Sequence, residues 1–261
     1  MGLIASLPDI DKYDDSVFVM HEKSEKLIPL HTHKKGQLSY VEGGIAYISI
    51  HQKTYVVPAR HYFWIPQGVP HVLRLGHSAT VLHSLYFYAA DDHVSPFYSQ
   101  LGIYPASELL IQMINYTERW DGTHLQPTDR HFDFLASLKK LLPESNREAL
   151  PIILPITEDE RMLAIIHYLE EHLAEPISLG LLSAQFHMSD RSMSRMFQSH
   201  LHISFLQYLK NLRMIRAIEL LVKTSKPVAE IAFAVGYDSV ASFSNAFYGL
   251  TQSRPSEFRK I

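Results

Sequence analysis

The chain has 261 residues, enough for one large domain or two ordinary ones. A hydrophobic fraction of 46% and a charged fraction of 20% support a buried core and exclude a disordered chain. No segment approaches the ~20 consecutive apolar residues of a membrane helix, and the first residues lack a signal-peptide pattern. The absence of cysteine excludes disulfides, thiolate metal sites and cysteine nucleophiles, so we expect a cytoplasmic protein.

Charge is distributed unevenly along the chain, whose net charge is −3. Residues 177–261 hold ten Lys/Arg against five Asp/Glu, or +5, which leaves 14 against 22, or −8, for the other 176 residues. A basic carboxyl-terminal third attached to an acidic remainder favours contact with a polyanion through that third alone.

Short β-type runs fill the chain from about Val17 to Tyr88, and turn residues such as Gly43-Gly44, Pro58 and Pro66-Gln67-Gly68 separate them. Strands spaced by roughly 8–12 residues predict an antiparallel sandwich or barrel. The clearest expected strands are Leu38–Val41, Ile45–Ile50, Thr54–Val57, His71–Leu75 and Val81–Tyr88.

The apolar period then changes to that of two amphipathic helices, within about 106–142. Such helices could cover the open side of a small barrel or pair between subunits, and simple core packing explains the pattern equally well. The apolar positions are Leu109, Leu110, Met113, Ile114 and Trp120 for the first helix, and Phe132, Leu135, Leu138, Leu141 and Leu142 for the second.

Three prolines between Pro143 and Thr157 predict a linker, after which the pattern is helical to the end. The sequence therefore predicts an α+β protein of two domains. Residues 1–142 form the barrel with its two helices, 143–157 the linker, and 158–261 an all-α domain.

The all-α domain contains the layout of a helix-turn-helix unit twice. In the first unit, Ser178 caps a helix over 179–186, a turn follows at 187–189, and a second helix starts near Asp190. In the second unit, a helix starts at Pro227, a turn follows at 236–238, and another helix runs from Ser239 towards Gly249. A long helix over 205–222 joins them. Two such units could place their second helices about 34 Å apart, in successive major grooves of one duplex.

Both units meet the packing requirements of the motif. Ser183 and Ala232 supply the small residue where the two helices cross. His187 and Gly236 occupy the turn position that favours left-handed φ, and Ser189 and Ser239 are expected N-caps of the second helices.

The residues of this segment resemble the AraC/XylS family of bacterial transcription regulators over nearly the whole of 177–260. The resemblance departs at His202 and Gln252, where the family usually has glycine, and at Asn245, where an arginine is common. It is carried by Arg195-Met196-Phe197, Tyr208-Leu209, Arg213, Arg216-Ala217, Leu220-Leu221, Ile231-Ala232, Val235-Gly236-Tyr237, Phe243, Phe247 and Pro255-Ser256-Glu257-Phe258-Arg259.

This resemblance implies the residues that face DNA. Arginines one helical turn apart suit guanine edges or phosphates, and Asn245 suits adenine. Ordinary solvated surface is the alternative for all of them. The implied residues are Arg191, Ser194 and Arg195 in the first unit and Ser242, Ser244 and Asn245 in the second.

The amino-terminal strands resemble a cupin sensor domain over about 27–85. His31-Thr32-His33, Gln37 and Gly44 match its first motif with Gln37 in place of the usual Glu. Pro66-Gln67-Gly68-Val69-Pro70-His71 matches the second, with Arg60 in place of its leading Gly and Leu75 in place of its trailing Asn.

His31 and His33 alternate along a strand, so they project to one face, and His71 could complete three imidazoles around Zn, Fe, Mn, Ni or Co. Neutral Gln37 is a weaker ligand than the carboxylate it replaces. Polar contacts to a small effector and a structural histidine network are the competing interpretations. Gln37, Tyr40, Tyr47 and Trp64 are the candidate effector-binding residues, although Trp64 could equally be plain core.

Together these features predict a DNA-binding transcription regulator of the cytoplasm and nucleoid, with no catalytic residues. Its barrel would sense a small molecule or a metal ion. A metal-dependent cupin enzyme is one alternative, and an effector-independent DNA-binding protein with a dimerising barrel is another. The expected partners are a double-stranded DNA operator and an unknown effector, while a homodimer and a contact with RNA polymerase stay open.

Overall fold

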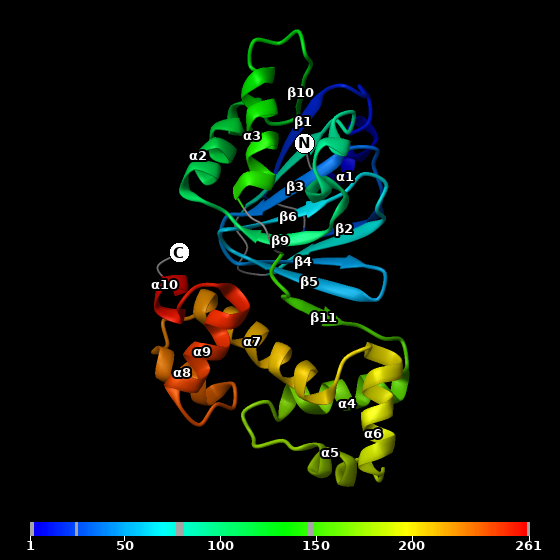
Figure 1. Ribbon diagram of the computed structural model, residues 1–261, viewed down its shortest axis with the longest axis vertical. Helices are drawn as coiled ribbons and strands as arrows, with labels where there is room; N and C mark the ends of the chain where they lie inside the picture. Colours follow the sequence, from blue (N-terminus) through cyan, green and yellow to red (C-terminus); the bar gives the residue numbers. More distant parts are fainter. Residues whose placement is uncertain (1–2, 24–25, 77–80, 146–148, 260–261) are drawn as a thin grey trace. The chain divides into compact units, whose positions relative to one another are not determined.

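The computed structural model describes residues 3–23, 26–76, 81–145 and 149–259, so Lys260 of the family-like segment lies outside the described residues. The chain divides into two compact units (Figure 1). One unit comprises Met1–His51 with Tyr55–Pro151, and the other comprises Gln52–Thr54 with Ile152–Ile261. None of the helices in these described ranges is long and apolar enough to span a membrane.

The first unit is built from antiparallel strands in two sheets, which confirms the predicted fold class. A six-stranded sheet has the order β10-β1-β8-β3-β6-β9, and the other sheet contains the run β5-β4-β7-β2. The strands are β1 (Val17–Glu22), β2 (Leu27–His31), β3 (Gly36–Val41), β4 (Ile45–Ile50), β5 (Lys53–Pro58), β6 (His61–Ile65), β7 (His71–Leu75), β8 (Leu82–Phe87), β9 (Gly102–Pro105) and β10 (Thr123–Leu125).

The two sheets differ in how their strands are buried. Every residue of β1, β3, β6 and β8 is buried, because the six-stranded sheet is covered on both faces. Strand β7 of the other sheet alternates between buried and more exposed residues, as expected for a sheet with one solvated face. The buried strands nevertheless contain polar residues, because Gln37 and Ser39 of β3 hydrogen-bond to each other and Ser39 to Ser84 of β8.

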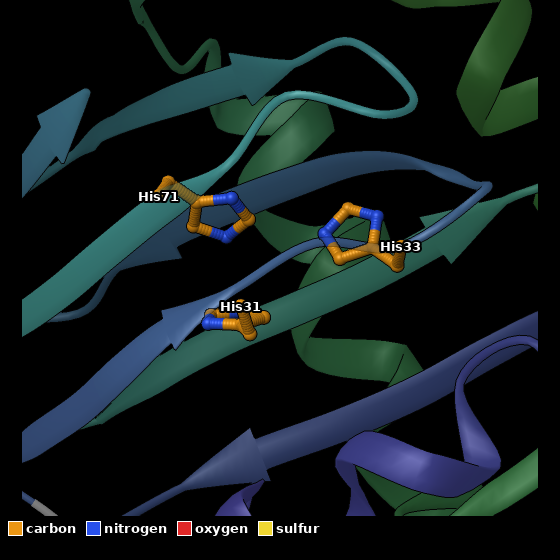
Figure 2. A group of neighbouring side chains, drawn as sticks. All are labelled: His31, His33 and His71. Atoms are coloured by element: carbon orange, nitrogen blue, oxygen red, sulfur yellow. The ribbon is translucent and has the colours of Figure 1, made fainter. Parts of the chain in front are cut away.

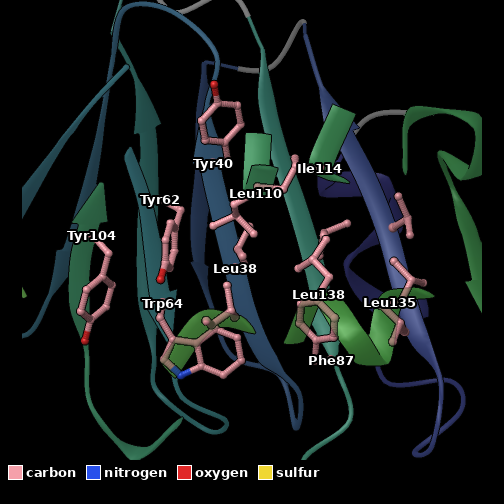
Figure 3. Close-up of a cluster of buried hydrophobic side chains, with 14 of the residues drawn as sticks. Leu38, Tyr40, Tyr62, Trp64, Phe87, Tyr104, Leu110, Ile114, Leu135 and Leu138 are labelled. Atoms are coloured by element: carbon pink, nitrogen blue, oxygen red, sulfur yellow. The ribbon is translucent and has the colours of Figure 1, made fainter. Parts of the chain in front are cut away.

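Helices α2 (Glu108–Tyr116) and α3 (Phe132–Ser145) pack on one face of the six-stranded sheet. Leu110 and Ile114 of α2 and Leu135 and Leu138 of α3 join the core formed by the sheet (Figure 3). The expected apolar face of α2 is wrong at Leu109, which is 61% exposed while Ile111 is buried. The short elements around them are α1 (Leu3–Ser6), η1 (Leu7–Asp9), η2 (Asp92–Val94), η3 (Pro96–Ser99) and η4 (Thr117–Trp120).

The segment expected as a linker is partly regular structure. Helix α3 continues through Pro143, and strand β11 covers Ile153–Pro155. A proline inside a helix leaves the carbonyl four residues earlier without its N–H donor. The Tyr98 hydroxyl donates to that carbonyl of Lys139 at 2.9 Å, so the helix tolerates Pro143.

The second unit is helical, and its helices begin and end close to the predicted positions. Asn211 Nδ2 on the long helix donates to the Ile153 carbonyl of β11 at 3.1 Å. The helices are α4 (Glu160–Glu171), α5 (Leu179–Gln185), α6 (Asp190–Met196), the π-helical turn η5 (Phe197–Leu201), α7 (Phe205–Lys223), α8 (Val228–Ala234), α9 (Val240–Thr251) and α10 (Pro255–Arg259).

Candidate nucleic-acid interface and ligand site

Helices α6 and α9 begin with the same cap. The Ser189 side chain accepts from the Ser192 N–H at 3.2 Å, and the Ser239 side chain accepts from the Ser242 N–H at 3.2 Å. Each cap satisfies one of the N–H groups that a helix start leaves unpaired. Both predicted N-caps are confirmed, so the two helices share a common starting point for comparison.

The two turns before these helices also match the prediction. His187 has φ 53° and Gly236 has φ 81°, both in the left-handed region. Ser183 and Ala232 are 2% and 0% exposed where the paired helices cross. A Cβ at Gly236 would lie 2.5 Å from the Leu173 carbonyl oxygen, so this turn needs glycine for space as well as for φ.

Packing fixes which face of each helix reaches solvent. Apolar side chains on one face of each helix are fully buried, which turns the opposite face of the helix outward. They are Met193 and Phe197 in the first helix-turn-helix unit and Phe243 and Phe247 in the second. Ser194 and Arg195 follow Ser189 by five and six residues, as Ser244 and Asn245 follow Ser239. Four of the six candidate residues therefore occupy equivalent positions in the two helices. Ser244 is half-buried and the other five candidates are exposed: Arg191, Ser194, Arg195, Ser242 and Asn245.

Ser242 and Asn245 also have hydrogen-bond partners within the second helix-turn-helix unit. The Ser242 hydroxyl oxygen accepts from Ser239 Oγ at 3.0 Å, so this side chain supports the cap. Asn245 Oδ1 accepts from Arg254 Nη1 at 3.3 Å, which leaves its amide N–H groups directed outward as donors. Arg254 is an exposed cation beside the candidate surface that sequence reasoning missed.

Both helix-turn-helix units end at a residue in the left-handed region that is not glycine. His202 has φ 57° and Gln252 has φ 58°, at the positions where the related family usually has glycine. A side chain in this region costs about 1–2 kcal/mol of backbone strain. Both turns therefore carry backbone strain.

Three imidazoles meet between β2 and β7 in the stranded unit of the chain (Figure 2). His31 ends β2 and pairs in register with His71 at the start of β7, and His33 follows β2 by two residues. One ring nitrogen of each lies within 4.8 Å of those of the other two. His33 and His71 are 3% and 0% exposed, so the centre lies mostly away from water.

Backbone carbonyls orient all three rings in the same way. Nδ1 lies 2.8 Å from the Pro29 oxygen in His31, 2.6 Å from the Lys35 oxygen in His33, and 2.9 Å from the Val69 oxygen in His71. Nδ1 of His31 and of His71 therefore carries the proton and donates it, which leaves the Nε2 lone pair for a ligand, whereas His33 has an acceptor oxygen beside each ring nitrogen. In the described part of the chain, Nε2 of His31 and of His71 is buried and has no hydrogen-bond partner.

Burial keeps these imidazoles neutral, which is the form that binds metals. It lowers the pKa of His31 and of His33, and with the neighbouring His31 it lowers the pKa of His71 to about 3. Gln37 Oε1 lies 2.8 Å from His33 Nε2. The donor set fits a divalent transition metal, provided that the Gln37 amide turns away from His33.

The structure does not place the four candidate effector residues on one face of the sheet. Gln37 and Tyr40 are an odd number of positions apart in β3, so they face opposite sides of the sheet. Tyr40 and Trp64 belong to the core under the helices, where the Trp64 indole N–H donates to the Tyr98 carbonyl at 3.0 Å. Tyr47 packs against Arg74 with 4.2 Å from its ring centre to the guanidinium. Gln37 contacts the histidine group through His33.

Two family models match the chain. An AraC-like ligand binding domain matches residues 20–92, and a helix-turn-helix domain matches residues 182–261. The chain is 26% identical over 232 residues to the HTH-type transcriptional regulator NimR of Escherichia coli, covering 88% of this chain and 82% of that protein. It is 36% identical over 91 residues to the HTH-type transcriptional regulator GbdR of Pseudomonas aeruginosa, covering 35% of this chain and 25% of that protein.

Among solved structures, the C-terminal domain of AraT, a response regulator from Geobacillus stearothermophilus, matches with 32% sequence identity and a TM-score of 0.38, covering 39% of this chain and 85% of that chain. The ligand-binding model falls on the stranded unit, and the helix-turn-helix model falls on the helical unit with its paired caps and turns. The chain therefore combines an AraC-like ligand-binding domain with a helix-turn-helix domain that follows it, the composition of an AraC-type DNA-binding transcription regulator.

Proposed function

We propose that helices α6 and α9 read operator DNA by entering successive major grooves. Support comes from the equivalent, outward positions of Ser194 with Ser244 and of Arg195 with Asn245, counted from the same serine cap. Two helices that follow a left-handed turn and begin with the same serine cap suit two half-sites one helical turn, about 34 Å, apart.

The two helices carry different chemistry. Arg191 and Arg195 are charged donors that suit the acceptor atoms of guanine or the phosphates. In α9 the exposed polar side chains are uncharged, and the Asn245 amide, held by Arg254, suits adenine. We therefore propose that α6 provides the stronger electrostatic contact and that α9 selects bases through Ser242, Ser244 and Asn245.

The test begins with selection of the fragments that the chain binds from random genomic DNA. On the selected site, Arg195→Ala is expected to weaken binding by about 1–3 kcal/mol and to relax the preference at one base pair. Arg130→Ala removes the same charge from an exposed residue of the first unit and serves as the control. An equal loss on every sequence would assign Arg195 to a phosphate, and unchanged binding would refute its role.

We further propose that the ligand-binding domain senses a divalent metal ion through His31, His33 and His71. The observation that carries this proposal is the common orientation of the rings, with each Nδ1 bonded to a carbonyl and two buried Nε2 atoms unpaired in the described chain. A bound ion would supply positive charge at the end of β2 and the start of β7. It would alter DNA binding only if it binds two arrangements of the protein with different affinity.

Operator affinity measured with a chelator and with Zn²⁺, Fe²⁺, Mn²⁺, Ni²⁺ or Co²⁺ tests this sensing role. We expect one ion to change the affinity in the wild-type chain and to have no effect in His31→Ala, whose side chain is only half-buried. A chain that binds no metal but is stabilised by small molecules in a thermal-shift screen would replace the metal by an organic effector. A chain that binds metal and turns over small substrates would instead favour the enzyme alternative.

A further inference from the structure

A second group of metal-ligating side chains lies in the first unit. Glu42, His83 and Glu118 each offer one ligand atom, and these atoms all lie within 4.8 Å of one another. Glu42 directly follows β3, His83 lies in β8, and Glu118 lies in η4 after α2. Three elements that are distant in sequence thus converge on one point.

This group is separate from the three histidines described above. His83 pairs in register with Tyr40 of β3, and Tyr40 belongs to the core beneath α2 and α3. Directly opposed residues of neighbouring strands share a face of the sheet. The Glu42–His83–Glu118 group therefore lies on the helix-covered face, whereas Gln37 and its partner His33 lie on the opposite face.

A further imidazole adjoins the group. His21 of β1 pairs in register with His83, and the two ring centres are 4.7 Å apart. The Thr117 hydroxyl donates to the Ile114 carbonyl at 2.6 Å, so its oxygen accepts from His21 Nε2 at 3.4 Å. The Nδ1 atoms of His21 and His83 are buried and have no partner among the described residues. His21 and His83 are 6% and 0% exposed, so the two rings form the buried side of the group.

The charges around His83 also favour a cation. His83 Nε2 lies 3.2 Å from Glu42 Oε2, and Glu118, Asp121 and Lys23 are the other charged groups that act on this ring. Three carboxylates against one ammonium group leave an excess of negative charge beside the imidazole. The Glu42 side chain is 47% exposed, which leaves a route for an ion from solvent.

We propose that Glu42, His83 and Glu118 bind a divalent transition-metal ion, with Zn²⁺ as the best match. One imidazole with two carboxylates suits zinc and its neighbours, whereas Mg²⁺ and Ca²⁺ prefer oxygen ligands alone. Ligand bonds of about 2.1 Å place tetrahedral ligand atoms about 3.4 Å apart. The two exposed carboxylates need to move only slightly inward to reach that spacing.

An ion at this point would connect the end of α2 to the sheet. Glu118 belongs to η4, which continues directly from α2, while Glu42 and His83 belong to the β3 and β8 region. Occupancy would therefore restrain the 114–120 segment against the strands, and exchange of its backbone amides should slow when Zn²⁺ binds.

The test measures Zn²⁺ binding to the full chain by equilibrium dialysis at buffered micromolar free zinc. The Glu42→Gln/Glu118→Gln double variant removes both charges at exposed positions, and Glu144→Gln removes one charge from an exposed site elsewhere in the unit. We expect the double variant to bind one equivalent fewer than wild type, with affinity at this site lowered by about tenfold or more. Glu144→Gln should match wild type, and zinc should slow amide exchange over 114–120 only where the site is intact.

Unchanged zinc stoichiometry in the double variant would overturn this proposal. The His31→Ala variant separates the Glu42–His83–Glu118 site from the proposed sensing site. It should lose the zinc equivalent bound by His31, His33 and His71 and keep the one bound by Glu42, His83 and Glu118. Binding that only His31→Ala abolishes would contradict the Glu42–His83–Glu118 site and support the sensing site. Binding that only the double variant abolishes would do the reverse.

Discussion

The left-handed turn at Gly236 provides a direct test of the helix-turn-helix packing. In Gly236→Ala, the residue keeps φ 81°, which costs an L-residue about 1–2 kcal/mol. Its Cβ would also lie 2.5 Å from both the Leu173 carbonyl oxygen and Arg213 Nη2. Arg213 cannot simply swing away without loss, because Nη2 donates to the Glu175 carbonyl at 2.8 Å. Overpacking of this kind adds about 1–3 kcal/mol, so we expect a total destabilisation of about 2–5 kcal/mol.

The two units can be followed separately in one urea titration. Both tryptophans, Trp64 and Trp120, belong to the first unit, whereas the second unit is helical. Gly236→Ala should lower the midpoint of the circular dichroism transition at 222 nm and leave the tryptophan fluorescence transition unchanged. His187→Gly is the matched control at the equivalent turn and should not destabilise. An unchanged 222 nm transition in Gly236→Ala would refute this reasoning.

Three further perturbations have defined outcomes. Burial lowers the pKa of His61 to about 4 and of His71 to about 3, so the unfolded chain binds more protons below about pH 6.5 and the first unit should lose about 1 kcal/mol per histidine for each pH unit down to pH 5. Urea titrations followed by tryptophan fluorescence in the presence of a chelator measure this loss. A midpoint that does not change with pH would contradict it. Lys139→Met removes a fully buried cation paired with Asp91 and a second aspartate, and should destabilise the same unit by about 3–5 kcal/mol; a loss below about 1 kcal/mol would show that the pair contributes little. His202→Gly relieves a left-handed residue and should stabilise the helical unit by about 0.5–1 kcal/mol, whereas a lower 222 nm midpoint would show that the His202 side chain contributes more than its strain.

The helical unit could be predicted closely because its signals are local. Ser189 and Ser239 cap the helices that follow them, and Gly236 is required by a single backbone angle. Arg254 was missed because its contact with Asn245 crosses from one helix to the next, a relation that spacing alone does not indicate.

The stranded unit was harder to predict because burial on both faces removes the alternation of polar and apolar residues. Strand β6 reads as continuous apolar sequence, so the face occupied by Trp64 was not evident. Gln37 and Tyr40 could have been separated by their odd spacing in β3. The group of Glu42, His83 and Glu118 could not be found from sequence, since only the strand register and the turn after α2 bring these residues together.

The most direct test of the two-helix DNA reading uses the absence of cysteine from the chain. Ser194→Cys and Ser244→Cys each introduce one thiol at equivalent positions of α6 and α9, to which an iron chelate that cleaves DNA can be attached. On the selected operator, the two conjugates should cut at centres separated by about 10 base pairs, one turn of the duplex. Cleavage by both conjugates at one position, or no cleavage from the α9 conjugate, would contradict the account.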